Sequence, residues 1–173
     1  FESIYKVLKR YKNNNLIKKI GISIYGPEEL DQIKNIDNFD IIQSPYNIFD
    51  RRIKNSGWLK RMSDSRVEVH IRSIFLQGLL LIEKTQRPKQ FHNWAPLWNY
   101  WDDWLKMNRI TPLEAALAFA LSEDSVKKII VGIDSELHLN EILSSVKEVK
   151  VNNFPKELSV TDENLINPSK WSL

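Results

Sequence analysis

The chain has 173 residues, of which 42% are hydrophobic and 27% are charged, a composition typical of a globular protein with a sizeable core and most simply of one domain. Its 25 basic and 22 acidic residues leave a formal net charge of +3, which gives no reason to expect nucleic acid as a partner. The absence of cysteine excludes disulfides and thiol chemistry, and no apolar stretch reaches the roughly 18 to 20 residues of a membrane span, so we expect a cytoplasmic protein without a membrane partner.

The first residues of the chain, from Phe1 onward, already have the pattern of a helix. Ile4, Tyr5 and Leu8 recur at helical spacing within residues 1–13. A chain that begins inside a helix is expected to be a piece of a longer protein.

Strand-like apolar runs then alternate with helical patterns. Gly26 and Pro27 open a helix after the first run, with acidic residues in its first turn. This alternation predicts a parallel sheet with right-handed crossovers, either an open doubly wound sheet or part of an eight-stranded barrel. In both architectures the functional residues lie at the carboxyl ends of the strands. The predicted strands are residues 17–24, 39–43, 67–73 and 128–133.

Two later helices have clear signals. Thr111 and Glu114 form the ends of a capping box around Pro112, which predicts a helix from Thr111 to Ser122. A second helix is predicted from Glu136 to about Val146, capped by Ser135 or Asp134. We expect buried stripes at Leu113, Leu117, Ala120 and Leu121 on the first helix, and at Leu139, Ile142, Leu143 and Val146 on the second.

Two segments fall outside the alternation. Residues 84–109 hold four of the six tryptophans and have no helical opening before about Pro96, so we expect an aromatic-rich loop or lid. Residues 151–173 are polar and broken by prolines, which indicates a tail packed along the surface through Phe154, Leu158 and Trp171. The remainder, residues 1–150, forms the predicted α/β unit.

The third predicted strand carries two kinds of side chain. Glu68, His70 and Arg72 alternate with apolar residues, so in a barrel these three would face the lumen, with Arg72 nearest the mouth. His70 is expected to be a satisfied core histidine. His92 has no acid or second histidine at metal-ligand spacing, so no metal site is expected.

Four short motifs follow one another along the chain. They are Lys19-Ile-Gly-Ile-Ser-Ile-Tyr25, then Gln43-Ser-Pro-Tyr-Asn47 with Asp50-Arg-Arg52, then Ile71-Arg-Ser-Ile-Phe-Leu-Gln-Gly-Leu-Leu80, and finally Ile129-Ile-Val-Gly132 leading into a capped helix. In this order they resemble the carboxy-terminal half of the aldo-keto reductase family. Asn167-Pro-Ser-Lys-Trp171 is similar to one bacterial branch of that family.

The resemblance implies a fold and a cofactor site. The fold would be the second half of a (β/α)8 TIM barrel, with about four parallel strands alternating with helices, and the cofactor would be NADP or NAD. Ser23 and Gln43 would bind the nicotinamide carboxamide, and the loop from Ser73 to Gln77 the pyrophosphate. The full set of implied cofactor-binding residues is Ser23, Gln43, Arg72, Ser73, Phe75, Gln77, Gly78, Gly132, Ser135, His138 and Glu141.

The chain also departs from the family pattern. Ile24 stands where the family has an asparagine, and Arg72 stands where it has an aromatic residue that stacks on the nicotinamide. Gly132, Ile133 and His138 stand where basic residues usually meet the 2′-phosphate, so a preference for NADPH is not implied. The catalytic aspartate, tyrosine, lysine and histidine of the family lie on the first four strands, which this chain lacks.

The resemblance therefore implies a parent enzyme that reduces an aldehyde or ketone, and a fragment that is inactive alone. An alternative is a non-catalytic nucleotide-binding or regulatory barrel module. A half-barrel would expose the apolar layer that its missing strands should cover. The expected partners are thus the cofactor, a small carbonyl substrate, and either the missing amino-terminal half or a second copy.

Overall fold

The structure is a computed structural model that describes residues 2–33, 36–148, 151 and 153–171. Four strands form one sheet, in which every neighbouring pair is parallel. The spatial order β1-β2-β3-β4 follows the chain order, without the reversal that marks a doubly wound sheet. Sequential addition of parallel strands is instead the arrangement of a barrel wall. The strands are β1 (Gly21–Ser23), β2 (Ile41–Pro45), β3 (Glu68–Arg72) and β4 (Val126–Ile129).

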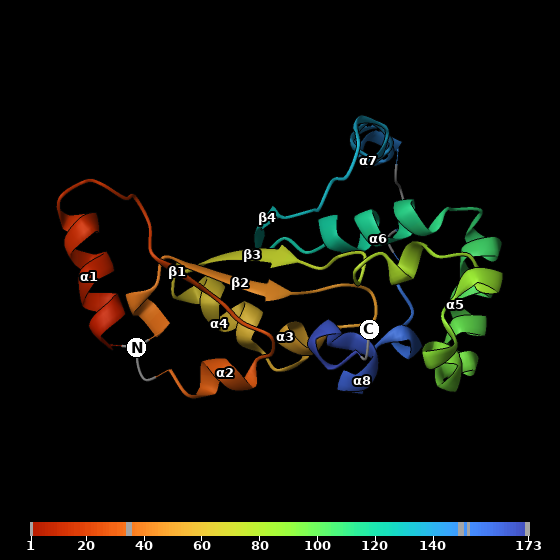
Figure 1. The fold of residues 1–173 in the computed structure, drawn as a ribbon, viewed down its shortest axis with the longest axis horizontal. Coiled ribbons are helices and arrows are strands. Elements are labelled where there is room, and N and C mark those ends of the chain that lie inside the picture. The colour runs from red at the N-terminus through yellow and green to blue at the C-terminus, as the bar shows by residue number, and fades with distance from the viewer. Residues whose placement is uncertain (1, 34–35, 149–150, 152, 172–173) are drawn as a thin grey trace.

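Helices separate these strands. Figure 1 shows α1 at one end of an elongated molecule, α5 at the other, and α7 projecting from the body. The α-helices are α1 (Glu2–Asn13), α2 (Glu28–Asp31), α3 (Arg52–Asn55), α4 (Trp58–Asp64), α5 (Ala95–Asn108), α6 (Pro112–Leu121), α7 (Glu136–Glu148) and α8 (Glu163–Ile166). Short 3-10 helices are Ile36–Asn38, Leu79–Leu81, Lys84–Gln86, Lys89–Trp94, Lys156–Leu158 and Pro168–Lys170.

The four strands confirm the predicted α/β half-barrel, but their limits differ from the predicted ones. The last strand begins and ends earlier than predicted, at Val126 and Ile129. The Ile130 N–H still donates to the Ile71 carbonyl over 2.8 Å, and the chain beyond it leaves the sheet. Residues 131–135 therefore belong to a connection, which forms one wall of the cavity described below.

Helix α6 forms as its start signal predicts. The Thr111 side chain accepts a hydrogen bond from the Glu114 N–H, and the Glu114 side chain accepts one from the Thr111 N–H. The predicted buried stripe is wrong at one position, since Leu121 is 47% exposed. Residues 115–120 are all buried, because the middle of α6 is covered on every side, whereas its first turn is only partly buried.

Residues 84–109 are not a loop, and this part of the prediction is corrected. After two 3-10 helices the segment continues as α5, a helix of 14 residues. Trp98, Trp101 and Trp104 are buried on α5, and the Phe49 ring lies 5.0 Å from that of Trp98. These tryptophans fill the core, which accounts for their number in this segment.

The carboxy-terminal segment packs more deeply than a surface tail. Leu158, Leu165 and Ile166 are buried, and the Arg51 side chain donates to the Pro155 carbonyl over 2.7 Å. The Trp171 ring lies 4.9 Å from that of Phe91. The predicted boundary between residues 150 and 151 falls where residue 150 lies outside the described residues.

The predicted lumen face of the sheet is polar. Val69 and Ile71 are buried, whereas Glu68, His70 and Arg72 carry the polar contacts of β3. His70 is buried as expected, but its Nε2 forms no hydrogen bond among the described residues and lies 3.5 Å from a Glu68 carboxylate oxygen. The predicted role of His70 as a satisfied core residue is therefore wrong.

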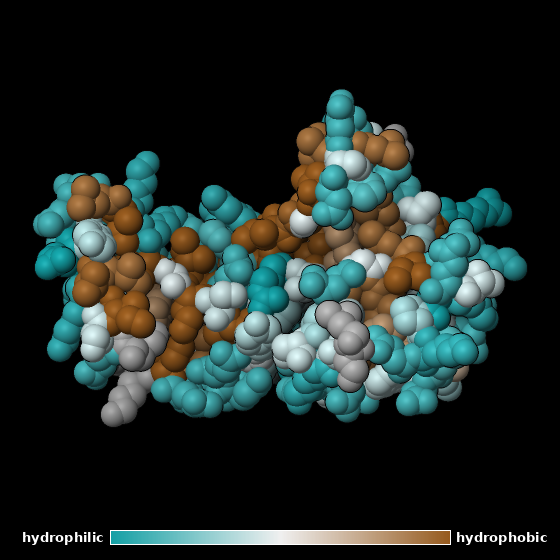
Figure 2. All heavy atoms as spheres, viewed as in Figure 1, coloured by the Kyte–Doolittle hydropathy of each residue, from teal (hydrophilic) through white to brown (hydrophobic). Residues whose placement is uncertain are grey.

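Two helices at the ends of the chain order of strands, α1 and α7, each carry several exposed apolar residues. On α7 only Ile142 of the predicted stripe is buried, whereas Leu139, Leu143 and Val146 are exposed. Ile4, Val7 and Tyr11 of α1 are likewise exposed. Figure 2 shows hydrophobic atoms at the surface over both helices. Among the described residues, no helix has the length and apolar character needed to cross a membrane.

Candidate functional site

A cavity of about 630 Å³ lies at the carboxyl end of the sheet. The loop after β3, the connection after β4, the amino end of α6 and the first turns of α7 form its walls. Its volume is in the range of small-molecule pockets, which run from about 300 to 1,000 Å³. Seven of the predicted cofactor residues line it: Ser73, Phe75, Gln77, Gly78, Gly132, His138 and Glu141.

The loop after β3 has a strained backbone. Ser73, Leu76 and Gln77 have φ angles of 58°, 49° and 53°, in the left-handed region that residues with a side chain rarely adopt. Gly78 follows with a φ angle of 82°, which glycine adopts without steric strain because it has no Cβ. Such strain persists only where the surroundings enforce it, and it gathers at ligand sites.

The same loop carries free hydrogen-bond donors. Within the described part of the chain, the main-chain N–H groups of Phe75, Gln77 and Gly78 donate to no other group. Successive free N–H groups in a loop of left-handed residues form a concave site that favours anions. The loop is therefore suited to bind a phosphate or pyrophosphate.

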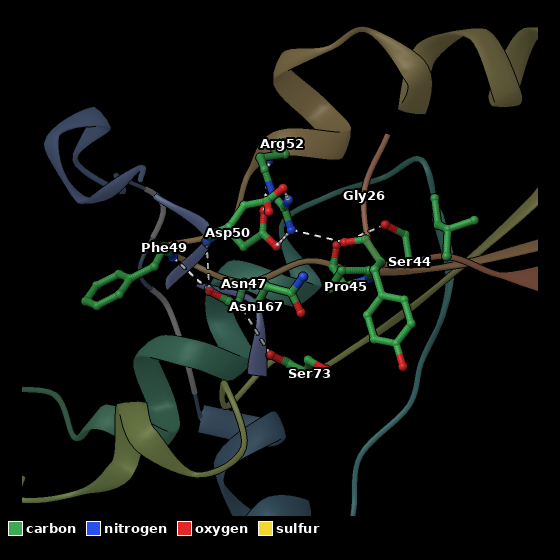
Figure 3. Close-up of polar contacts among 12 residues, drawn as sticks. Gly26, Ser44, Pro45, Asn47, Phe49, Asp50, Arg52, Ser73 and Asn167 are labelled. Carbon is green, nitrogen blue, oxygen red and sulfur yellow. Dashed lines mark hydrogen bonds and ion pairs between the residues drawn. The ribbon is translucent and has the colours of Figure 1, made fainter. Parts of the chain in front are cut away.

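Asn47 anchors this loop to the end of β2. Its Nδ2 donates to the Ser73 carbonyl over 3.1 Å, and its Oδ1 accepts from the N–H groups of Phe49 and Asp50, each over 2.9 Å. Figure 3 shows these contacts converging on one amide between two strand ends. Because Asn47 is 1% exposed, no water can replace these bonds without opening the structure.

A buried ion pair between Arg52 and Asp50 stabilises the segment that follows β2. Arg52 binds the carboxylate of Asp50, which is 1% exposed, and also donates to the Tyr25 carbonyl at the end of β1 over 3.0 Å. Its remaining nitrogen reaches Glu163 of α8 over 3.0 Å. Arg52 thus ties β1, the loop after β2 and the carboxy-terminal segment together (Figure 3).

Three predicted residues meet at the strand ends beside the cavity. The Ser23 hydroxyl donates to the Gln43 side-chain carbonyl over 3.2 Å, and the Arg72 Nε lies 3.4 Å from the same hydroxyl. The register places Ser23 directly beside Gln43. This cluster of Ser23, Gln43 and Arg72 joins the cavity through Ser73, whose hydroxyl accepts from Arg72 over 3.2 Å.

The Arg72 guanidinium is held in one place. It donates to the Ile24 carbonyl over 3.0 Å and lies 5.2 Å from the centre of the Tyr25 ring. A planar cation in this position can stack on an aromatic ligand or bind an anionic group.

Ser135 has a different position from the other predicted residues. It caps α7, since its hydroxyl accepts from the His138 N–H over 3.2 Å, and it does not line the cavity. Its neighbour Asp134 and two residues of α7, His138 and Glu141, line the cavity instead.

The sequence interpretation missed part of the lining. Thr111, Pro112 and Leu113 at the start of α6, and Asp134 in the connection after β4, complete the walls. The capping box identified the start of α6 but not its position beside the loop after β3, which only the packing shows. The sequence pattern predicts Asp134 only as a possible cap for α7, whereas the structure places it in the cavity wall.

The strand-end cluster and the adjoining cavity offer different kinds of polar group. The cluster of Ser23, Gln43 and Arg72 offers side-chain donors and acceptors for an amide, and the cavity offers N–H groups for phosphates and a wall of α7 for a nucleoside. A metal has no corresponding donor set, because no group of three histidine, aspartate or glutamate residues that could hold one occurs in the described ranges.

Comparisons with known proteins match the chain to the aldo/keto reductase family. The model of the aldo/keto reductase family matches residues 1–158. Aldo-keto reductase YhdN of Bacillus subtilis is 27% identical over 85 residues, which are 49% of this chain and 25% of that protein. Such relatives are bacterial, as the predicted branch is.

Solved structures agree in fold. Aldo-keto reductase AKR11C1 of Bacillus halodurans, in its holo form, matches with a TM-score of 0.61 and 20% identity over 86% of this chain and 51% of that one. The thermostable aldo-keto reductase Tm1743, in complex with the inhibitor epalrestat, matches with a TM-score of 0.60 and 23% identity over 89% and 51%. The chain therefore spans about half the length of these solved relatives.

Proposed function

The chain belongs to the aldo/keto reductase family, and we propose that it supplies the cofactor side of a barrel that reduces an aldehyde or ketone with NADPH or NADH. The observation that carries this proposal is the continuity of the site. The cluster of Ser23, Gln43 and Arg72 leads through Ser73 into the cavity without a break. An extended ligand with an amide at one end and a nucleoside at the other fits this layout.

Each part of the site has a role in this proposal. Ser23 and Gln43 hold the nicotinamide carboxamide and so fix which face of the ring meets the substrate. The free N–H groups of Phe75, Gln77 and Gly78 bind the pyrophosphate. His138 and Glu141 border the adenosine, with Ser135 fixing the start of their helix. The bound cofactor supplies the hydride.

Arg72 has a role that differs from the family pattern. Its contacts with Ile24 and Ser73 hold the guanidinium beside the amide-binding pair. There it stacks on the nicotinamide ring in place of an aromatic residue, or holds an anionic group of the substrate. Either role places Arg72 at the ligand and not only in the barrel wall.

A comparison of two ligands tests the nicotinamide end. We expect Gln43→Ala to weaken NADPH and NADH binding by roughly tenfold, the cost of one to two lost hydrogen bonds, and to leave ADP-ribose unaffected. Arg72→Ala should likewise weaken binding of NADPH and NADH and leave binding of ADP-ribose unchanged, because ADP-ribose has no nicotinamide. Isothermal titration calorimetry of the 173-residue chain measures both ligands.

The matched control is Gln90→Ala, which truncates an exposed glutamine on the 3-10 helix Lys89–Trp94. It should change neither affinity. Equal losses for ADP-ribose and the dinucleotides would mean that Gln43 and Arg72 only support the fold. No binding of any of these ligands by the unaltered chain would refute the cofactor site itself.

The open edges of the sheet require a covering partner. Among the described residues, β1 and β4 each pair on one side only. Each edge already has its own helix, because α1 precedes β1 and α7 follows β4. In a closed barrel one helix covers each gap between strands, so a second copy would bring two helices to each gap. An amino-terminal half of four strands and three helices would place its helices only between its own strands. Each gap between the two halves would then hold one helix, α1 or α7, and we propose that such a half is the partner.

Without that partner the exposed stripes of α1 and α7 should associate loosely. Sedimentation equilibrium of the chain is expected to show a concentration-dependent mixture rather than one defined dimer. Leu143→Asn should reduce the association, because Leu143 is 52% exposed on α7. Met107→Asn, at an 81% exposed position on α5, serves as the control and should not. A single tight dimer that resists Leu143→Asn would favour a second copy as the partner.

A further inference from the structure

The charges that line the cavity are of one sign. The ionisable residues in its lining are Asp134, His138 and Glu141, and no lysine or arginine is part of it. Two carboxyl groups thus line the space, and no guanidinium or ammonium group lies in the lining beside them. The basic residues that precede the connection, Lys127 and Lys128, belong to β4 and do not line the cavity.

These charges should affect the binding of NADP and NAD differently. NADP carries a 2′-phosphate on its adenosine ribose, with a charge of about −1.5 to −2 near neutral pH, as for other phosphate monoesters. Protein sites that recognise a phosphate monoester commonly hold it with arginine or lysine, whose charge-assisted hydrogen bonds are strong, and this end of the cavity offers neither. Two carboxylates in the same cavity would repel it.

An unphosphorylated ribose suits the same residues. A carboxylate is a pure acceptor, and the 2′-hydroxyl and 3′-hydroxyl of a ribose are donors. An acidic side chain performs this role in other dinucleotide folds, where it selects NAD. Asp134 lies in the connection and Glu141 on α7, so the two carboxylates approach the cavity from adjoining elements.

We propose that Asp134 and Glu141 make the cavity selective for a dinucleotide with a free adenosine ribose, so that the chain binds NADH in preference to NADPH. This inference rests on the proposed cofactor site. It concerns the end of that site remote from Gln43 and Arg72, so it can fail while the site itself stands.

The test compares the affinities of NADH and NADPH for the 173-residue chain by calorimetry at equal ionic strength. We expect NADH to bind at least about tenfold more tightly, the size of effect of one unpaired charged group. Asp134→Asn with Glu141→Gln should reduce the ratio several-fold. Glu136→Gln removes an acid of α7 that does not line the cavity, and should leave the ratio unchanged.

Gly132 allows the reverse experiment. A Cβ at this position would meet no atom within 4 Å, so a side chain fits without displacing a neighbour. Gly132→Arg should strengthen NADPH binding several-fold with little change for NADH. Gly132→Ala separates the added charge from the added side chain and should not strengthen NADPH binding.

Three outcomes would count against the inference. Tighter binding of NADPH by the unaltered chain would overturn it and leave the cofactor site in place. A ratio that is insensitive to Asp134, Glu141 and Gly132→Arg would also overturn it, because the adenosine would then lie elsewhere. Absence of binding by both cofactors would overturn this inference and the proposed function together.

Discussion

The 173-residue chain is expected to bind a nicotinamide dinucleotide and to reduce no carbonyl compound. Reduction by hydride requires an acid that protonates the oxygen as charge develops on it, an effect of about 10²- to 10⁴-fold in rate. Among the described residues, neither the strand-end cluster nor the cavity lining contains a tyrosine or lysine that could serve. Cofactor oxidation with a panel of aldehydes and ketones should therefore match the rate without protein.

Tyr46 follows the proposed cofactor residue Gln43 by three positions, yet it cannot act as this acid. Its side chain is 1% exposed, and its ring lies 4.9 Å from that of Phe119 on α6. Burial, and then the neighbouring Glu123 carboxylate, raise the pKa of the Tyr46 hydroxyl far above its ordinary value. A phenol with a raised pKa is a weaker proton donor, so Tyr46 is a structural residue.

Tyr25 supplies the check on this prediction. It is 53% exposed and lies under the Arg72 guanidinium, close to the amide-binding pair. Turnover by the chain that disappears in Tyr25→Phe would contradict the prediction and make Tyr25 the proton donor. Calorimetric binding of the cofactor without turnover would support it, and turnover restored by an amino-terminal barrel half would identify the parent as an enzyme. Failure of that half to restore turnover would favour a nucleotide-binding or regulatory module.

Asn47→Ala is expected to destabilise the chain by about 2 to 4 kcal/mol and to abolish cofactor binding. The substitution removes the acceptor of the Phe49 and Asp50 N–H groups, both of which are buried. It also releases the Ser73 carbonyl, so the loop after β3 loses its link to β2. Because that loop holds left-handed residues only under constraint, its free N–H groups should lose their arrangement.

Urea unfolding and calorimetry measure the two effects. Asn55→Ala is the matched control, since Asn55 is exposed and its amide only reaches Ser159 over 3.3 Å. It should cost less than about 0.5 kcal/mol and leave binding intact. Unchanged affinity in Asn47→Ala, measured where the variant is still folded, would mean that the loop keeps its shape without Asn47.

Local chemistry made much of the fold predictable from sequence. The capping box of α6 needs only residues three apart, and the alternation of polar and apolar residues in β3 needs only the pleat of a strand. The order of four motifs then identified the family and, through it, the barrel. The ends of β1 and β3 were predicted to within one residue, because polar residues follow their apolar runs, whereas the end of β4 was predicted too late.

What the sequence by itself determined is thus the architecture and the family, and it named candidate site residues of which seven line one cavity. The tertiary structure alone decided that Asn47 anchors the loop after β3, that Asp134 and the start of α6 complete the cavity, and that the stripe of α7 is largely exposed. The reason is physical. Periodicity shows which face of an element is apolar, but whether another element covers that face, and which distant residues meet across a cavity, depends on contacts between segments far apart in the chain.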